Sequence, residues 1–318
     1  MCSFLLLRNF FLCILFSTPI QMLFAERAYV SNRDDGNVSV INTSTNTVVR
    51  TIPVGRMPFG IASTPNGAYV YVANENAIHV IETARNIVIS EITTDSEILS
   101  VSVTPDGAYA YATSMGGNTV FVIDTATNTV IRSIDVGSDP FAIAITPDGT
   151  RAYLTHENIN SVFVIDIATN VVTSTVDVGN TQRGIAITPN GAYAYVACGE
   201  NITAIDIATN AVTATIPWEN GGCEEIVFTP AGAYAYVVDE TNVTVIDMVT
   251  NAIIKNINVG LNPFGLAITS NGSHVYVANG YQDDTVSVID TKTHTVTSTI
   301  RVGNVPGRVT IARDITDK

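Results

Sequence analysis

The sequence has 318 residues, of which 46% are hydrophobic and only 14% are charged, and its formal net charge is −14. This hydrophobic content is sufficient for a packed core and excludes a globally disordered chain. The negative charge disfavours non-specific binding to nucleic acid or to anionic membranes.

The first 25 residues have the layout of a secretory signal peptide. Arg8 precedes a short apolar run at residues 10–16, and cleavage is expected after Ala25. The run is too short to span a bilayer, which takes about 20 apolar residues. No later segment is long and apolar enough to do so. We therefore expect an exported mature chain without a membrane span, located in the periplasm, at the cell surface or in the medium.

The rest of the chain repeats at a fixed period. A Thr-Pro-Asn/Asp/Ala-Gly turn, written Thr-Ser-Asn-Gly in its last copy, recurs every 40 to 42 residues, at 64–67, 104–107, 146–149, 188–191, 229–232 and 269–272. One unit contains four runs with strand character, at 141–146, 151–155, 161–165 and 171–176. Four short strands in about 40 residues, repeated, predict all-β propeller blades of four antiparallel strands.

The two ends of the repeat array are incomplete in a complementary way. Residues 28–32 match the second strand of a unit whose first strand is absent there. The missing strand reappears near the C-terminus, where residues 306–312 match residues 58–62. We therefore predict seven blades in one domain, residues 26–318, with the ring closed by the C-terminal strand pairing with the N-terminal blade.

These units resemble the YVTN family of β-propeller repeats. The motif is AYVSN at 28–32, VYVANE at 70–75 and VYVANG at 275–280, and the resemblance covers essentially all of residues 26–318. It implies a seven-bladed propeller of the surface-layer or periplasmic type. Similar propellers serve as binding proteins, DNA-associated proteins, redox-enzyme subunits, lactonases and lyases, so the resemblance does not select one function.

Loops on one rim carry the sequence variation. In a propeller, the connection before the first strand of a blade and the connection between its second and third strands share the face that holds the channel mouth. Variation there over a constant scaffold is typical of a binding surface, although loops also vary without function. The predicted binding rim comprises Arg56, His156, Arg183, Glu224, Glu225, Tyr281, Asp283, Asp284 and Arg308.

One position of the repeat changes from apolar to charged. Phe59, Phe141 and Phe264 hold it in three units, whereas Arg183 and Glu224 hold it in two neighbouring units. Two interpretations remain open. These two residues form an inter-blade salt bridge, or together with Glu225 and Arg308 they line a polar channel mouth that holds a small anion or cation.

The sequence contains weak signals for chemistry. His156 and Glu157 are the candidate acid–base pair, but no nucleophile or metal-ligand set accompanies them, and an exposed loop histidine is the preferred interpretation. The pairs Asp34-Asp35 and Asp283-Asp284 lack the spacing of an EF-hand loop. We expect no cofactor, with a divalent cation left open as an alternative.

Cys198 and Cys223 remain after removal of the leader and should lie one blade apart on the same rim. They form either a disulfide, as an oxidising compartment permits, or two separate thiols.

The function predicted from these features is an exported monomeric scaffold, without chemistry of its own, that binds a protein or a small ligand at the channel rim. The first alternative is a lactonase or lyase that uses the rim His and carboxylates. The second is periplasmic DNA association, which the net charge disfavours.

Overall fold

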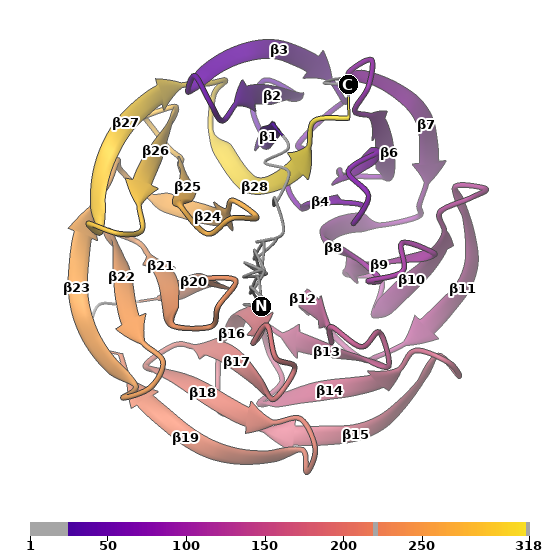
Figure 1. The fold of residues 1–318 in the computed structure, drawn as a ribbon. Coiled ribbons are helices and arrows are strands. Elements are labelled where there is room, and N and C mark those ends of the chain that lie inside the picture. The colour runs from indigo at the N-terminus through magenta and orange to yellow at the C-terminus, as the bar shows by residue number, and fades with distance from the viewer. Residues whose placement is uncertain (1–24, 219–221, 316–318) are drawn as a thin grey trace, which may run out of the picture.

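Seven four-stranded antiparallel sheets surround a central channel in the computed structural model, which describes residues 25–218 and 222–315 (Figure 1). Each sheet is one blade of a propeller, and in six of the seven blades the strands run from the channel outward in chain order. The predicted fold, a seven-bladed all-β propeller with four-stranded antiparallel blades, is confirmed. The predicted signal peptide, residues 1–25, lies outside the described residues except for Ala25.

The strands fall into four concentric sets. The innermost strands are β28 (Pro306–Arg313), β4 (Ile61–Ser63), β8 (Glu97–Val103), β12 (Pro140–Ile145), β16 (Gln182–Ile187), β20 (Cys223–Phe228) and β24 (Pro263–Ile268). The second strands are β1 (Glu26–Asn32), β5 (Tyr69–Ala73), β9 (Tyr109–Met115), β13 (Arg151–His156), β17 (Tyr193–Cys198), β21 (Tyr234–Asp239) and β25 (His274–Asn279). The third strands are β2 (Asn37–Asn42), β6 (Ala77–Glu82), β10 (Thr119–Asp124), β14 (Ser161–Asp166), β18 (Asn201–Asp206), β22 (Asn242–Asp247) and β26 (Thr285–Asp290). The outer strands are β3 (Thr47–Pro53), β7 (Ile87–Thr93), β11 (Thr129–Asp135), β15 (Val171–Asp177), β19 (Ala211–Pro217), β23 (Ala252–Asn258) and β27 (Thr295–Arg301).

Turn chemistry separates the strands of a blade, as blade 4 (β12 to β15) illustrates. Between β12 and β13, the carboxylate of Asp148 accepts a hydrogen bond of 2.6 Å from the Thr146 hydroxyl, and Gly149 adopts φ +71°. Between β14 and β15, Asp166 accepts from the backbone amide of Thr169 at 2.8 Å. Each side chain satisfies backbone or hydroxyl donors that a tight turn leaves unpaired.

The C-terminal strand closes the ring. In blade 1, β28 lies at the channel and pairs antiparallel with β1, with Val30 opposite Val309 (Figure 1). Arg27 and Asp314 add an ion pair of 2.6 Å across the same junction. The predicted closure is confirmed, and the unpaired edge that β1 would otherwise expose is covered.

Neighbouring blades bury one apolar layer between them. Between blades 2 and 3, Tyr71 and Ile92 of one blade pack against Ile98 and Phe121 of the next. Because both faces of a blade are covered in this way, the second and third strands are buried along most of their length. Of the eleven tyrosines predicted to pack in second strands, seven are at most 7% exposed, while the tyrosine that begins each pair is half-buried or exposed.

Buried tyrosines also hydrogen-bond from each blade to the next. Tyr71 Oη donates to Asn128 Oδ1 at 2.7 Å, and this asparagine has φ +53°, which Asn tolerates better than most residues. The corresponding pairs are Tyr29–Asn86, Tyr111–Asn170, Tyr153–Asn210, Tyr195–Asn251, Tyr236–His294 and Tyr276–Asn46. The last pair joins blade 7 to blade 1, so the set completes a circle.

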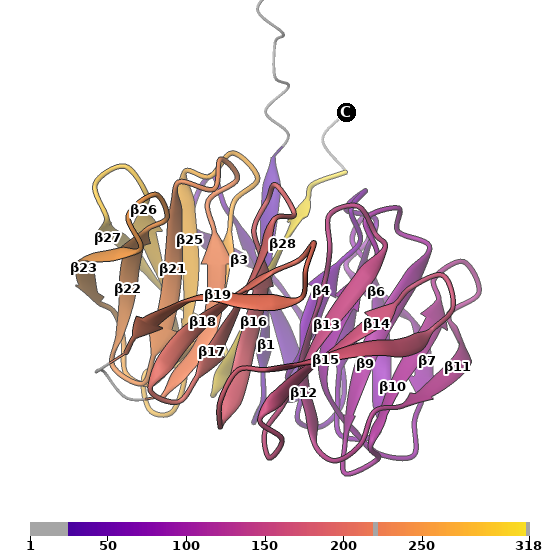
Figure 2. The ribbon, with the colours of Figure 1, turned by 90° about the horizontal axis from the view of Figure 1, so that it is seen from below.

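The propeller has two chemically different rims. We call the rim with the repeated Asp/Asn turns the turn rim, and the opposite rim, formed by the connections into the innermost strand and between second and third strands, the variable rim. β1 begins and β28 ends on the turn rim (Figure 2). The points where the chain enters and leaves the propeller therefore lie away from the variable rim.

Candidate functional site

Backbone hydrogen bonds join the two kinds of loops on the variable rim. In blade 4 the amide of Glu157, after the second strand, donates to the carbonyl of Asp139, before the first strand, at 3.1 Å. In blade 1 the backbone amide of Arg33 donates to the carbonyl of Val305 at 2.9 Å. The two sets of connections thus share one face, as predicted from the repeat.

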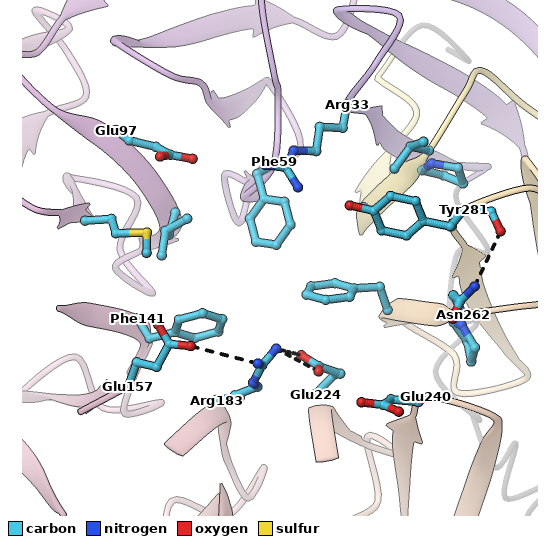
Figure 3. A pocket seen from close by; sticks show the side chains of 18 residues that line it. Arg33, Phe59, Glu97, Phe141, Glu157, Arg183, Glu224, Glu240, Asn262 and Tyr281 are labelled. Carbon is cyan, nitrogen blue, oxygen red and sulfur yellow. Dashed lines mark hydrogen bonds and ion pairs between the residues drawn. The ribbon is translucent and has the colours of Figure 1, made fainter. Parts of the chain in front are cut away.

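A cavity of about 610 Å³ opens on this rim at the axis of the propeller, and we call it the mouth (Figure 3). Its floor is apolar and consists of Phe59, Leu99, Met115, Phe141 and Phe264. Its wall carries Arg33, Glu97, Glu157, Glu240 and Tyr281. An apolar cavity with a few converging polar groups is the usual form of a ligand site.

The floor follows from the position of the phenylalanines in the repeat. Phe141 and Phe264 are the second residues of β12 and β24, and Phe59 lies two residues before β4, where the innermost strands of all blades converge on the axis. The rings of Phe59 and Phe264 meet edge to face with centroids 5.2 Å apart, and Leu99 packs with Phe141 across the floor. Aromatic rings from separate blades therefore form one continuous apolar surface.

Arg183 and Glu224 form the inter-blade salt bridge that the first interpretation of the sequence predicted. Arg183 Nη1 lies 2.8 Å from Oε1 and 3.0 Å from Oε2 of Glu224, and Nη2 lies 3.9 Å from a carboxylate oxygen of Glu157 (Figure 3). Of the four residues in the second interpretation, Arg183 and Glu224 line the mouth, whereas Glu225 and Arg308 line a separate, smaller cavity.

A second ion pair lies deeper in the channel. Arg308 Nη1 is 2.5 Å from Glu225 Oε1, and Glu225 Oε2 accepts a hydrogen bond of 2.6 Å from the amide of Leu266. Both side chains line a smaller cavity of about 120 Å³ below the floor. Burial raises the pKa of Glu225 above its ordinary value, and Arg308 offsets part of this increase. The other blades have Gly, Ser or Ala at this position, so the pair occupies space that the repeat leaves open.

The guanidinium groups contact the floor. The guanidinium carbon of Arg183 lies 5.8 Å from the ring centroid of Phe141, and that of Arg308 lies 5.1 Å from the centroid of Phe264. These distances are within the range of cation–π attraction. The floor therefore already stabilises positive charge from the protein itself.

His156 is not at the surface of the rim, which corrects the sequence prediction. It is the last residue of β13, fully buried, with Nε2 donating to the carbonyl of Val136 at 3.0 Å and the ring packed on Phe163. Burial lowers the pKa of His156. Neither the exposed loop histidine nor the accessible acid–base pair exists, and Glu157 alone reaches the mouth.

The remaining predicted rim residues divide into three groups. Tyr281 lies in the mouth with its side chain 57% exposed. Arg56 lies in a separate hollow farther from the axis and pairs with Glu75 at 3.6 Å. Asp283 accepts a backbone hydrogen bond of 2.8 Å from Leu261, in the connection into the same blade, and Asp284 accepts one of 3.0 Å from Val305, in the connection into the next blade, so both hold loops together.

Cys198 and Cys223 are two buried free thiols in the structure, so the disulfide interpretation is not the one observed. Burial raises the pKa of Cys198 to about 11 and raises that of Cys223 well above its ordinary value. Thiols in this environment are poor nucleophiles.

Three wall residues were not selected from the sequence. Arg33, Glu97 and Glu240 lie in predicted rim loops, but nothing in the repeat distinguishes them from other charged loop residues. The floor phenylalanines were recognised only as a regular position of the repeat. Their place at the start of the innermost strand was the signal that they face the channel mouth.

In residues 25–218 and 222–315, no group of three or more His, Cys, Asp or Glu side chains is arranged to hold a metal ion. The same part of the chain contains no helix long and apolar enough to cross a bilayer.

Residues 17–184 match the choice-of-anchor I domain, which is more than half of the sequence. The chain belongs to this family. The family indicates an exported or surface protein, and the propeller fold is shown, whereas membership of the YVTN repeat family stays a prediction. No curated protein matches the sequence significantly.

Two solved structures illustrate the fold. Hydrazine synthase from Kuenenia stuttgartiensis is 25% identical with a TM-score of 0.78, and the match covers 83% of this chain and 92% of that one. A functionally unknown protein from Desulfotomaculum acetoxidans is 19% identical with a TM-score of 0.80, covering 90% of this chain and 99% of that one. The second likeness concerns the fold alone.

Proposed function

We propose that this protein is an exported or cell-surface propeller that acts as a binding scaffold, with the mouth of the variable rim as its ligand site. The observation that carries the proposal is the cavity of about 610 Å³, which combines an apolar floor with charged walls. Its size is that of a pocket for a small molecule or for a side chain of a partner protein.

The position of the mouth supports this role. The chain enters and leaves the propeller on the turn rim, so the variable rim faces away from these points. The floor residues come from four blades, which are fixed by the closed ring. A rigid scaffold with a preformed cavity loses little conformational entropy when it binds a ligand.

The lactonase or lyase alternative is weaker than the sequence indicated. It relied on His156 as the base of a rim site, and the structure buries this imidazole against Val136 and Phe163. His274 and His294 lie on the turn rim, away from the mouth. DNA association remains disfavoured by the net charge of −14.

Methionine methyl groups allow a direct test by NMR. Met115 lines the mouth, Met57 lies in the outer hollow, and Met248 packs on the turn-rim side of blade 6. With ¹³C-methyl labelling, fragments that bind at the proposed site should shift the Met115 signal and leave those of Met57 and Met248 unchanged. A fragment library that never moves Met115, or moves all three together, would contradict the proposal.

A further inference from the structure

We propose that the ligand of the mouth is an organic cation, namely an ammonium or guanidinium group carried on an apolar stem. This inference rests on the proposed function, since it identifies the chemical class that the same cavity binds. It follows from the charge of the wall, from the pairing of individual carboxylates and from the chemistry of the floor.

The upper part of the mouth has an excess of negative charge. Four carboxylates line it and only two guanidinium groups, which gives a net charge of −2. The carboxylates are Glu97, Glu157, Glu224 and Glu240, and the guanidinium groups are Arg33 and Arg183. The deeper pair of Arg308 and Glu225 is neutral as a unit. A concave site over an apolar floor of low dielectric constant concentrates this field and attracts cations.

Two of the four carboxylates have no ion-pair partner in the described part of the chain. Glu224 and Glu157 both face Arg183, at 2.8 Å and 3.9 Å. Glu97 and Glu240 make neither an ion pair nor a side-chain hydrogen bond within residues 25–218 and 222–315, and they stand at opposite edges of the cavity (Figure 3). An incoming cation can therefore pair with either group without breaking an existing contact.

The floor complements a cation that carries an apolar group. Phe264 and Phe59 already lie within 6 Å of the Arg308 guanidinium, and Phe141 within 6 Å of the Arg183 guanidinium. A ligand stem would cover Leu99 and the phenylalanine rings and remove their surface from water. Ring faces and edges in this arrangement accept a nearby positive charge.

An anion fits the same site poorly. Of the two guanidinium groups in the mouth, Arg183 is neutralised by Glu224, whereas Arg33 makes no ion pair within residues 25–218 and 222–315. An anion that pairs with Arg33 would still enter a mouth with a net charge of −2. It would also face the carboxylates of Glu97 and Glu240 at the edges of the cavity. The geometry therefore selects against phosphates and carboxylates.

Three probes with the same phenylethyl stem show how affinity depends on ligand charge. They are the cation phenethylammonium, the neutral 2-phenylethanol and the anion 3-phenylpropanoate. Each is titrated into the labelled protein, and the dissociation constant is read from the Met115 methyl shift. We expect the cation to bind about tenfold tighter than the alcohol, the anion to bind most weakly, and added salt to reduce the difference.

Matched variants test the two unpaired carboxylates. The double variant Glu97→Gln, Glu240→Gln is expected to bind phenethylammonium about tenfold more weakly and the alcohol equally well. The control is Glu200→Gln, because Glu200 is an exposed residue in the same type of loop as Glu240 but does not line the mouth. Its affinity for every probe should equal that of the parent protein.

The remaining outcomes separate the two proposals and the two sources of the cation. If blocked lysine and arginine amides shift the Met115 signal as strongly as phenethylammonium does, the cation is a side chain of a partner protein. If phenethylammonium shifts the signal and the amides do not, the cation is a free amine. Equal affinity for cation and alcohol, unchanged by the double variant, would overturn the cation inference and leave the binding site in place. A Met115 signal that no probe moves would overturn both.

Discussion

The phenolic Oη of Tyr236 lies 2.7 Å from Nδ1 of His294, at the one of seven blade junctions where a histidine replaces the asparagine of the repeat. Burial lowers the pKa of His294, Lys255 lowers it further, and Asp290 has a smaller opposite effect. The neutral ring can accept a hydrogen bond from the tyrosine hydroxyl at Nδ1, whereas the protonated ring has no acceptor nitrogen. The junction between blades 6 and 7 is therefore the one that acid should weaken.

The first prediction concerns the pH dependence of stability. Because the folded pKa of His294 is below its ordinary value of 6.5, the unfolded chain binds the proton more readily. Stability from this residue is present above pH 6.5 and is lost as the pH falls below that value. Since His294 is only half-buried, we expect a loss of under about 1 kcal/mol. Urea unfolding at pH 8 and at pH 5 measures the difference in the free energy of unfolding.

The control for this prediction is His294→Asn, which restores the residue of the other six junctions. His79 and His156 also have lowered pKa values and contribute to acid sensitivity, so the comparison is between variant and parent. The variant should lose less stability than the parent between pH 8 and pH 5. Equal losses would show that the Tyr236 contact does not depend on protonation.

The second prediction tests the ion pair below the mouth. Glu225→Ala leaves Arg308 without its carboxylate in a mostly buried position, and we expect a loss of about 2–4 kcal/mol in the free energy of unfolding. The double variant Glu225→Ala, Arg308→Gly has the small residues that other blades use there. It should recover most of the loss in chemical denaturation. If the double variant is as unstable as the single one, the small residues of the other blades cannot replace the ion pair at these two positions.

The third prediction concerns His156. His156→Ala removes a buried ring and its hydrogen bond to Val136, so the expected loss of stability is about 2–3 kcal/mol. His156→Asn, the residue found at this position in three other blades, should cost less. Neither change should alter the affinity of a ligand for the mouth, as read at Met115. If either variant folds normally but no longer binds a ligand at the mouth, His156 takes part in the binding site.

The fourth prediction concerns the two thiols. Because burial raises the pKa of Cys198 to about 11 and raises that of Cys223 well above its ordinary value, few thiolates exist at pH 8. Alkylation followed by peptide mass mapping should find Cys198 and Cys223 unmodified in the native protein and both modified in urea without reductant. A protein that resists modification in urea until a reductant is added would contain the disulfide instead.

The fold could be read from the sequence because every blade repeats the same turn chemistry. The four runs predicted in blade 4 differ from the observed strands by one residue at some of their ends. Ring closure was predicted because residues 306–312 match residues 58–62, and the strand pairing of Val309 with Val30 follows from that match. Periodicity carries this information without any side-chain contact.

The site depended on features that periodicity does not contain. His156 lies one residue beyond the predicted strand, and this single position decides between an exposed loop and a buried strand end. The charged position of Arg183 and Glu224 was evident, but the partners of each carboxylate depend on rotamers. The absence of an ion pair at Glu97 and Glu240, within the described residues, became visible only when the loops of different blades were placed together.

A crystal structure of the protein with phenethylammonium would show directly whether the mouth binds an organic cation. We expect the aromatic ring of the ligand over Phe264 and Leu99 in the mouth, and its ammonium nitrogen within about 4 Å of a carboxylate oxygen of Glu97 or Glu240. A mouth without the ligand at a concentration that saturates the Met115 shift, or a ligand bound on the turn rim, would contradict it.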